Sequence, residues 1–125
     1  MKMIIAGGRD YEFTIADVVW LHQIAIEHGP IEEVVTGGAS GADAEGRRWA
    51  ELKEIPAREF PPDWTTHGKA AGPIRNRQMA RHVGPGGLCV LFPGGRGTAS
   101  MKKEALSAGL TVIERGSPPP PPPRG

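Results

Sequence analysis

The sequence predicts an α/β fold, in which a single three-layer domain has about five mostly parallel strands with helices on both faces. Two observations predict it. Short apolar runs of strand length alternate with longer segments in which apolar residues recur at helical spacing. Glycine-rich turns follow several of these apolar runs, where a strand would pass into a helix. Strands that alternate with helices pair in parallel through right-handed crossovers, which place helices on both faces of the sheet.

The first half of the chain supplies three of the strands and two of the helices. Its first helix keeps an apolar stripe at near-3.6-residue spacing until Gly29 and Pro30 stop it. Its third strand is weaker because Pro61 and Pro62 cut it short. In chain order we expect a strand at 1–6, a helix at 13–28, a strand at 31–36, a helix at about 42–53 and a strand at 55–60.

The second half adds two helices and two strands. A glycine-rich break at 84–87 precedes the most compact apolar run, and Gly109 stops the last helix. In chain order we expect a long loop at 63–72, a helix at about 73–82, a strand at 88–92, a helix at about 98–108 and a strand at 110–114.

The proline-rich end of the chain, residues 116–125, is expected to lie outside the packed domain, which then covers residues 1–115. Consecutive prolines favour extended polyproline II without tertiary contacts, so we expect a flexible segment. It serves either as a solvated spacer or as a PxxP ligand for a partner domain.

The composition argues against several classes of protein. Fifteen Lys and Arg oppose fourteen Asp and Glu, and a net charge of +1 gives no global field for a nucleic acid. Cys89 is the only cysteine and the four histidines have no ligand spacing, so we expect no disulfide, no metal and no required cofactor. No apolar stretch has the length of a membrane span or signal peptide, so we expect no membrane contact and a cytoplasmic location.

The segment FPGGRGT at residues 92–98 is the most informative motif. Glycines at 94, 95 and 97 allow positive φ and the close approach of a ligand, and the start of the following helix favours an anion such as phosphate. Arg96 adds a fixed positive charge. The alternative is a glycine turn that only connects a strand to a helix.

Other unusual residues also follow the ends of strands, so they are expected at the same edge of the sheet. Ser40 and Asp43 have the spacing of a capping box, and Asp43 is also suited to accept a hydrogen bond from a ribose hydroxyl. Arg75 is expected in the first turn of a helix, where the dipole disfavours a cation unless an anion compensates. Trp64 either stacks on a base or pins its loop to the core. The residues expected to bind a ligand are Gly8, Arg9, Gly37, Gly38, Ser40, Asp43, Lys69, Arg75, Asn76, Gly94, Gly95, Arg96, Gly97 and Thr98.

Five motifs, in order, resemble the YspA-type, cpYpsA-related branch of the SLOG superfamily, over nearly the whole chain except the proline tail. This resemblance implies a Rossmann-like fold that binds nucleotides or nucleotide-derived ligands. Related SLOG proteins often pair through helices, which implies a homodimer. The motifs are GGRDY at 7–11, VVTGGASGAD at 34–43, FPPDW at 60–64, GKAAGPIRNRQM at 68–79 and FPGGRGTASM at 92–101.

More distant relatives are the LOG phosphoribohydrolases, which release a base from a nucleoside monophosphate. Their signature PGGxGTxxE places a glutamate where this chain has Met101, and a thioether cannot carry a proton. Glu104 lies one turn further along and is a poor substitute. Arg75 corresponds to the arginine of the LOG motif, and Asn76 replaces the lysine beside it.

The sequence therefore favours a protein that binds a small-molecule nucleotide, or a derivative such as ADP-ribose or a cyclic compound, in order to sense or sequester it. One alternative is a hydrolase of nucleotide N-glycosidic bonds, with Asp10, Asp43 or Asp63 as the acid or base. A second is single-stranded DNA binding, as in the related protein DprA. The few aromatic residues and the net charge of +1 offer little for that role.

Overall fold

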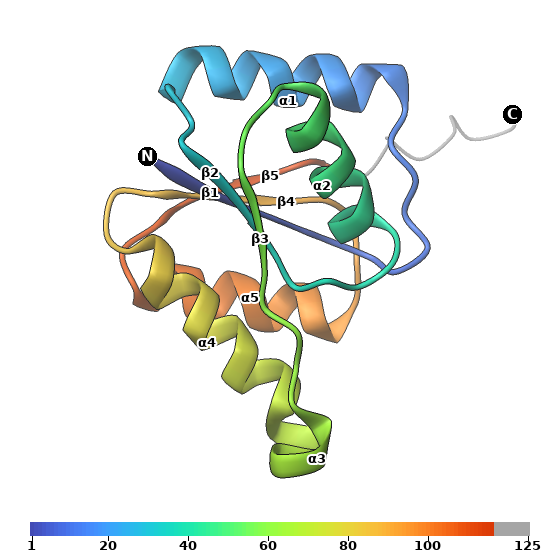
Figure 1. The fold of residues 1–125 in the computed structure, drawn as a ribbon, viewed down its shortest axis with the longest axis vertical. Coiled ribbons are helices and arrows are strands. Elements are labelled where there is room, and N and C mark those ends of the chain that lie inside the picture. Colours follow the sequence, from blue (N-terminus) through green and yellow to red (C-terminus); the bar gives the residue numbers. More distant parts are fainter. Residues whose placement is uncertain (117–125) are drawn as a thin grey trace, which may run out of the picture.

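A parallel sheet of five strands, in the order β3-β2-β1-β4-β5, forms the centre of the structure (Figure 1). The structure is a computed structural model that describes residues 1–116. The strands are β1 (Lys2–Ala6), β2 (Glu33–Thr36), β3 (Ala57–Glu59), β4 (Leu88–Leu91) and β5 (Thr111–Glu114). The helices are α1 (Ile15–His28), α2 (Ala42–Leu52), α3 (Trp64–His67), α4 (Ala71–Val83) and α5 (Arg96–Ser107), with a 3₁₀ turn η1 (Gly68–Ala70). The predicted α/β class with helices on both faces is confirmed.

Two apolar clusters, one on each face of the sheet, form the core. On one face α1 and α2 pack Leu21 and Trp49 against the sheet. On the other face α4 and α5 pack Met79 and Met101 against it. The strands β1 and β4 are buried between these layers, which explains why their sequences read as continuous apolar runs.

The order of the strands reverses between β1 and β4. The chain proceeds from β1 outward to β2 and β3, and then returns to β4 on the other side of β1 and continues to β5. Ala6 pairs with Leu91, so both strands end at the same level. Immediately after them, the N–H of Gly8 donates to the carbonyl of Pro93 at 2.8 Å. Parallel sheets bind ligands outside the carboxyl ends of strands at such a switch point.

The expected loop at 63–72 is wrong, because this segment is helical. Asp63 accepts a hydrogen bond from the N–H of Thr66 at 3.1 Å and thereby caps α3. The turn η1 follows, and α4 begins at Ala71, which leaves Pro73 in its first turn, where a missing N–H costs nothing. Apolar periodicity gave no helical signal here because the side chains of residues 63–70 are exposed. The expectations for the proline tail lie outside the described residues.

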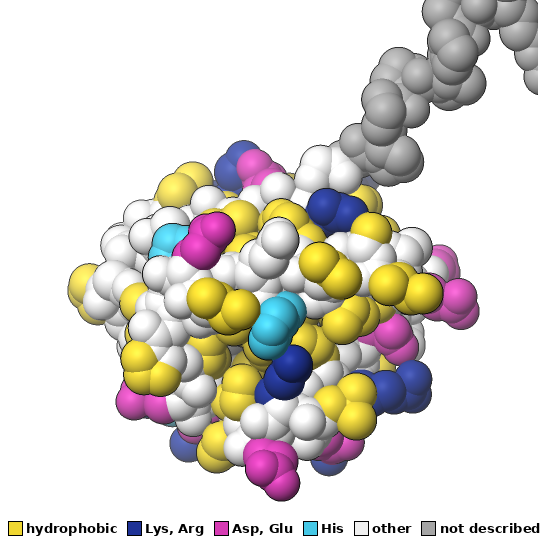
Figure 2. Space-filling model, turned by 90° about the horizontal axis from the view of Figure 1, so that it is seen from above, with side chains coloured by type: hydrophobic (Ala, Val, Ile, Leu, Met, Phe, Trp, Pro, Cys, Tyr) yellow, Lys and Arg dark blue, Asp and Glu magenta, His cyan; other side chains and the backbone are white. Residues whose placement is uncertain are grey.

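The helix α1 presents an apolar surface to solvent. Of its apolar stripe the structure buries Leu21 and Ile24, whereas Ile15, Val19 and Ile26 are 86%, 52% and 68% exposed. Figure 2 looks onto this face and shows hydrophobic side chains gathered on it. No helix of residues 1–116, α1 included, combines the length and apolar character needed to cross a membrane.

Asp17 joins the start of α1 to the end of β5. Its carboxylate is buried and accepts hydrogen bonds from the hydroxyl of Tyr11 at 2.8 Å and the backbone N–H of Thr14 at 2.9 Å. Nε of Arg115 donates to its other oxygen at 2.8 Å. Burial opposes ionisation of Asp17, but these hydrogen bonds outweigh it and hold the pKa of the carboxyl below its ordinary value of 3.8.

Asp17→Ala should lower the free energy of unfolding by about 3 kcal/mol, because it leaves Arg115 without its partner. Since the folded-state pKa lies below the unfolded value, the carboxylate stabilises the fold fully above the unfolded pKa. That contribution is lost as the pH falls through the folded-state pKa. Urea unfolding measures the difference in the free energy of unfolding between wild type and Asp17→Ala, and this difference should therefore be smaller at about pH 2 than at about pH 7.

The exposed Asp10 supplies the control for this prediction, and Asp10→Ala should change stability by less than about 0.5 kcal/mol. Equal losses for the two variants, or a difference that grows in acid, would contradict the role given to Asp17.

Candidate functional site

A cleft with two adjoining chambers lies at the carboxyl edge of the sheet. The outer chamber holds about 600 Å³ and is bounded on one side by Pro62, Trp64 and Lys69. The inner chamber holds about 320 Å³ and reaches the buried residues Met79 and Met101. The two chambers share the lining residues Arg9, Gly37, Ala39, Arg75, Asn76, Arg96 and Gly97.

The predicted ligand residues converge on this cleft. All of them except Gly94 line one or both chambers, although they come from the ends of β1 and β2, from η1 and α4, and from the turn after β4. The loops that the sequence placed at one rim therefore do lie together. That these residues contact a ligand stays a prediction.

The turn after β4 opens directly onto α5, as predicted. Gly95 occupies the N-cap position and no side chain caps the helix, so the first-turn N–H groups lack helical acceptors. A Cβ on Gly95 or Gly97 would meet no heavy atom within 4 Å. These two glycines leave the backbone open toward the inner chamber, where both of them form part of the lining.

The expectation of positive φ at Gly94, Gly95 and Gly97 is wrong, since the positive-φ glycines lie elsewhere. Gly94 is required for a different reason. A Cβ there would lie 2.1 Å from Oγ1 of Thr98 and 2.7 Å from the backbone nitrogen of Gly8. Gly94 therefore allows the turns after β1 and β4 to pack against each other, and it lines neither chamber.

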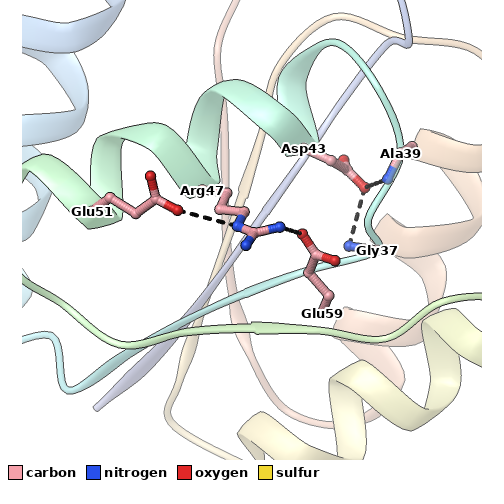
Figure 3. A network of polar contacts seen from close by, with 6 residues as sticks. All are labelled: Gly37, Ala39, Asp43, Arg47, Glu51 and Glu59. Atoms are coloured by element: carbon pink, nitrogen blue, oxygen red, sulfur yellow. Dashed lines mark hydrogen bonds and ion pairs between the residues drawn. The ribbon is translucent and has the colours of Figure 1, made fainter.

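The turn after β2 is held by Asp43, and the capping box expected with Ser40 is wrong. The N-cap of α2 is Gly41, which has a φ of 70° and provides no side-chain cap. Oδ2 of Asp43 instead accepts hydrogen bonds from the N–H groups of Gly37 at 3.0 Å and Ala39 at 3.3 Å (Figure 3). The hydroxyl of Ser40 donates to the carbonyl of Arg9 at 3.1 Å.

A second acidic side chain near this turn is held outside the cleft. Glu59, at the end of β3, accepts a hydrogen bond from Nη1 of Arg47 at 2.5 Å, and Nε of Arg47 donates to Glu51 at 3.3 Å (Figure 3). Arg47 and Glu51 both belong to α2. The pairing keeps Glu59 on the α2 side, and Glu59 lines neither chamber.

Arg75 lies between the turns, in the wall of both chambers. Its Nη1 donates to the carbonyl of Gly37 at 2.6 Å and to that of Phe60 at 3.2 Å, and its Nε donates to Oδ1 of Asn76 at 2.9 Å. A guanidinium has five N–H groups, so the two on Nη2 remain for a ligand. Burial lowers the pKa of Arg75, whereas the nearby Asp43 raises it, and the group stays charged.

The helix-dipole argument for Arg75 is wrong, because α4 begins at Ala71 and Arg75 lies beyond its first turn. The Asp43 carboxylate and the two carbonyls stabilise the charge instead. Asn76 is buried, and its Nδ2 donates to the carbonyl of Gly97 at 3.3 Å and to Oγ of Ser100 at 3.2 Å. Asn76 thus joins α4 to α5, with both amide N–H groups occupied.

The outer chamber is strongly cationic for a chain of net charge +1. Its lining includes no carboxylate, and the inner chamber adds only Asp43. Burial raises the pKa of Asp43, although hydrogen bonds from Ala39 and Gly37 and the charge of Arg75 oppose this. The concave wall concentrates a positive potential where an anion would bind. The cationic lining residues are Arg9, Lys69, Arg75 and Arg96.

Of the two roles considered for Trp64, pinning its segment to the core is wrong. The side chain is 52% exposed and lies in the wall of the outer chamber with Pro62 and Pro73. Sequence reasoning also missed Ser100, which lines the same chamber. Its position one helical turn after Arg96 is the signal that would have found it, since residues four apart share a face of a helix.

The three candidate catalytic acids are in different places. Asp10 is exposed and lines a separate hollow with Glu12 and Glu45. Asp63 caps α3, and the hydrogen bonds from Thr66 lower the pKa of its carboxyl. Asp43 is therefore the one candidate acid in the cleft.

The two residues compared with the LOG glutamate also differ in position. Met101 is buried and lines the inner chamber. Glu104 lies outside the cleft, where its carboxylate accepts a hydrogen bond from Nε of Arg77 at 3.3 Å. Glu104 therefore cannot take the place of a carboxylate at position 101.

Comparisons with known proteins support the resemblance. A family model described as "YspA, cpYpsA-related SLOG family" matches residues 1–67. Among curated proteins, the Gene 61 protein of Mycobacterium phage D29 is 41% identical over 93 residues, which cover 69% of this chain and 73% of that protein. No solved structure gives a significant match. The family match includes the turns after β1 and β2, whereas Arg75 and the turn before α5 follow its last residue.

The glycines of the turn before α5 should respond differently to alanine. Gly94→Ala should lower the free energy of unfolding by about 1–3 kcal/mol, because its Cβ overlaps Thr98 and the turn after β1. Gly97→Ala meets open space in a helical turn, so it should leave stability unchanged or raise it by about 0.5–1 kcal/mol. Urea unfolding followed by circular dichroism measures both, and equal losses would contradict this division of roles.

Proposed function

Since the chain belongs to the YspA, cpYpsA-related SLOG family, we propose that its cleft binds a nucleotide, or a nucleotide-derived ligand such as ADP-ribose or a cyclic derivative, in the cytoplasm. The protein would sense or sequester this ligand. One observation carries the proposal. Four cationic side chains and an uncapped helix start converge on a cleft whose outer chamber has no carboxylate in its lining.

The proposed pose places a phosphate at the start of α5. Gly95 and Gly97 leave the backbone N–H groups accessible, and Arg96 and Arg9, which line both chambers, add charge. The free Nη2 of Arg75 would contact the same anion. Oδ2 of Asp43 holds the turn after β2, and its Oδ1 would accept a hydrogen bond from a ribose hydroxyl.

A nucleotide at about 100 times its dissociation constant should stabilise the protein by about 2.7 kcal/mol, or about 10 °C in melting temperature. Arg96→Ala should weaken binding by about 10- to 150-fold, because a hydrogen bond to a charged group is worth about 1.5–3 kcal/mol. A thermal-shift panel of nucleotides, ADP-ribose and cyclic dinucleotides identifies the ligand, and calorimetry measures its affinity.

Arg81→Ala is the matched control for this experiment. Arg81 is an exposed arginine that lines a groove between α4 and α5, outside the cleft. The Arg81→Ala variant should bind as wild type does, because Arg81 lies outside the cleft. Both variants lose one positive charge, so a difference in affinity between them depends on the position of the arginine and not on net charge. A complete panel without any shift, or equal losses in both variants, would overturn the proposal.

Hydrolysis of an N-glycosidic bond is the alternative, and Asp43 is the acid it would use. Its buried carboxyl has a raised pKa and lines the inner chamber, which suits a group that donates a proton. Chromatography of the panel mixtures after incubation separates the two functions. Intact nucleotides support a binding protein, whereas free base establishes a hydrolase.

We further propose that two copies of the chain pair through the exposed face of α1. Ile15, Val19 and Ile26 recur at the spacing of one helical face, with the exposed His22 between the last two, so the surface is an apolar stripe that contains one imidazole. A two-fold axis needs only one such self-complementary patch on each copy. The cleft lies at the carboxyl edge of the sheet, and α1 contributes no residue to it.

Val19→Glu should convert the proposed dimer into a monomer, because pairing would bury a carboxylate without a partner. Leu106→Glu is the control, since Leu106 is an exposed apolar residue of α5, on the other face of the sheet. Sedimentation velocity measures the mass of each species. A monomeric wild-type protein would contradict the pairing, as would a monomeric Leu106→Glu variant.

A further inference from the structure

The segment that carries Trp64 forms an outlying wall of the cleft. α3 projects beside α4 at the end of the molecule away from the sheet (Figure 1). The indole of Trp64 lies close to Gly72 on α4, because a Cβ added to Gly72 would lie 3.8 Å from Cη2 of the indole. Pro62 and Pro73 line the chamber on the same side. The result is an aromatic ring that lies beside α4 at one edge and remains 52% exposed.

The outer chamber combines cationic and apolar surface. The guanidinium groups of Arg9, Arg75 and Arg96 come from the end of β1, from α4 and from α5, whereas the indole of Trp64 comes from α3, with Pro62 before it and Lys69 after it in the chain. A ligand that matches both parts has an anionic group at one end and a flat aromatic group at the other. A sugar phosphate satisfies the cations alone and leaves the indole uncovered.

We infer that Trp64 is the platform on which the base of the bound nucleotide stacks. This inference rests on the proposed function and adds to it that α3 recognises the base while α5 holds the phosphate. A base and an indole stack through their π faces, which fixes the base without requiring a hydrogen-bond partner. Trp64 thereby distinguishes nucleotides from base-free sugar phosphates.

The test compares AMP with ribose 5-phosphate, which has the phosphate and the sugar without the base. Wild-type protein should bind AMP more tightly than ribose 5-phosphate. Trp64→Ala should weaken AMP binding by roughly 5- to 150-fold, the range for the loss of one base–aromatic stack, and should leave ribose 5-phosphate unchanged. Trp64→Phe keeps a ring and should retain most of the preference for AMP. Calorimetry supplies all six affinities.

Fluorescence gives a second readout that a structural role of Trp64 would not change. AMP should quench the emission of wild-type protein, and ribose 5-phosphate should not. Trp20→Phe is the control, because Trp20 packs edge-on against Phe92 and lines neither chamber. The quench should persist in Trp20→Phe and vanish in Trp64→Phe, even though calorimetry still detects bound AMP.

The outcomes separate this inference from the proposed function. If both probes bind equally and Trp64→Ala changes neither affinity, the base platform is wrong while the phosphate site stands. If wild-type protein binds neither probe and no nucleotide of the thermal-shift panel, the proposed nucleotide site fails and the base platform fails with it. A loss of ribose 5-phosphate binding in Trp64→Ala would also overturn the inference, because it would show that the residue supports the whole cleft.

Discussion

The buried guanidinium of Arg75 is the interaction on which the cleft depends. It joins the carbonyls of Gly37 and Phe60, which follow β2 and β3, to the helix α4 that carries it. Neutral carbonyls alone do not compensate a buried charge, so the neighbouring Asp43 carboxylate is part of the same arrangement. Because Asp43 also holds the turn after β2, cation, carboxylate and turn form one unit. Within the described residues, the hydrogen bonds of this unit use Nε and Nη1 of Arg75, and none uses Nη2.

The glycines near the cleft serve two physical purposes that sequence alone does not separate. Gly94 is needed because the backbones of the turns after β1 and β4 are in contact. This contact places the two turns side by side at the edge of the sheet. Gly95 and Gly97 have open space where a side chain would project, so they leave the helix start accessible. Gly94 therefore permits the close packing of the two turns at the switch point, whereas Gly95 and Gly97 leave the backbone there accessible to an anion.

Much of the fold could be predicted from the sequence because the buried strands are apolar runs separated by glycine turns. The placement of residues such as Arg9, Arg75 and Arg96 in one cleft followed from the rule that parallel strands end at a common edge. The helix α3 escaped prediction because it has four residues, all exposed, and is stabilised by the Asp63 cap. The position of Trp64 depends on that helix, and the hydrogen bonds of Asp43 depend on the positive φ of Gly41. Such local geometry leaves no periodic pattern in a sequence.

Of the two proposed functions, ligand binding fits the residues of the inner chamber better than hydrolysis does. An acid catalyst needs a carboxyl that can exchange a proton with the reacting bond. Asp43 is the one carboxylate in the lining, and although burial raises the pKa of its carboxyl, its Oδ2 is committed to two backbone N–H groups that favour the ionised form. Met101 of α5, at the position of the LOG glutamate, lines the same chamber, and its thioether cannot carry a proton. The cationic groups and the uncapped helix start line the same cleft, so the proposed phosphate site needs no carboxyl at position 101, whereas the proposed hydrolysis would rest on Asp43 alone.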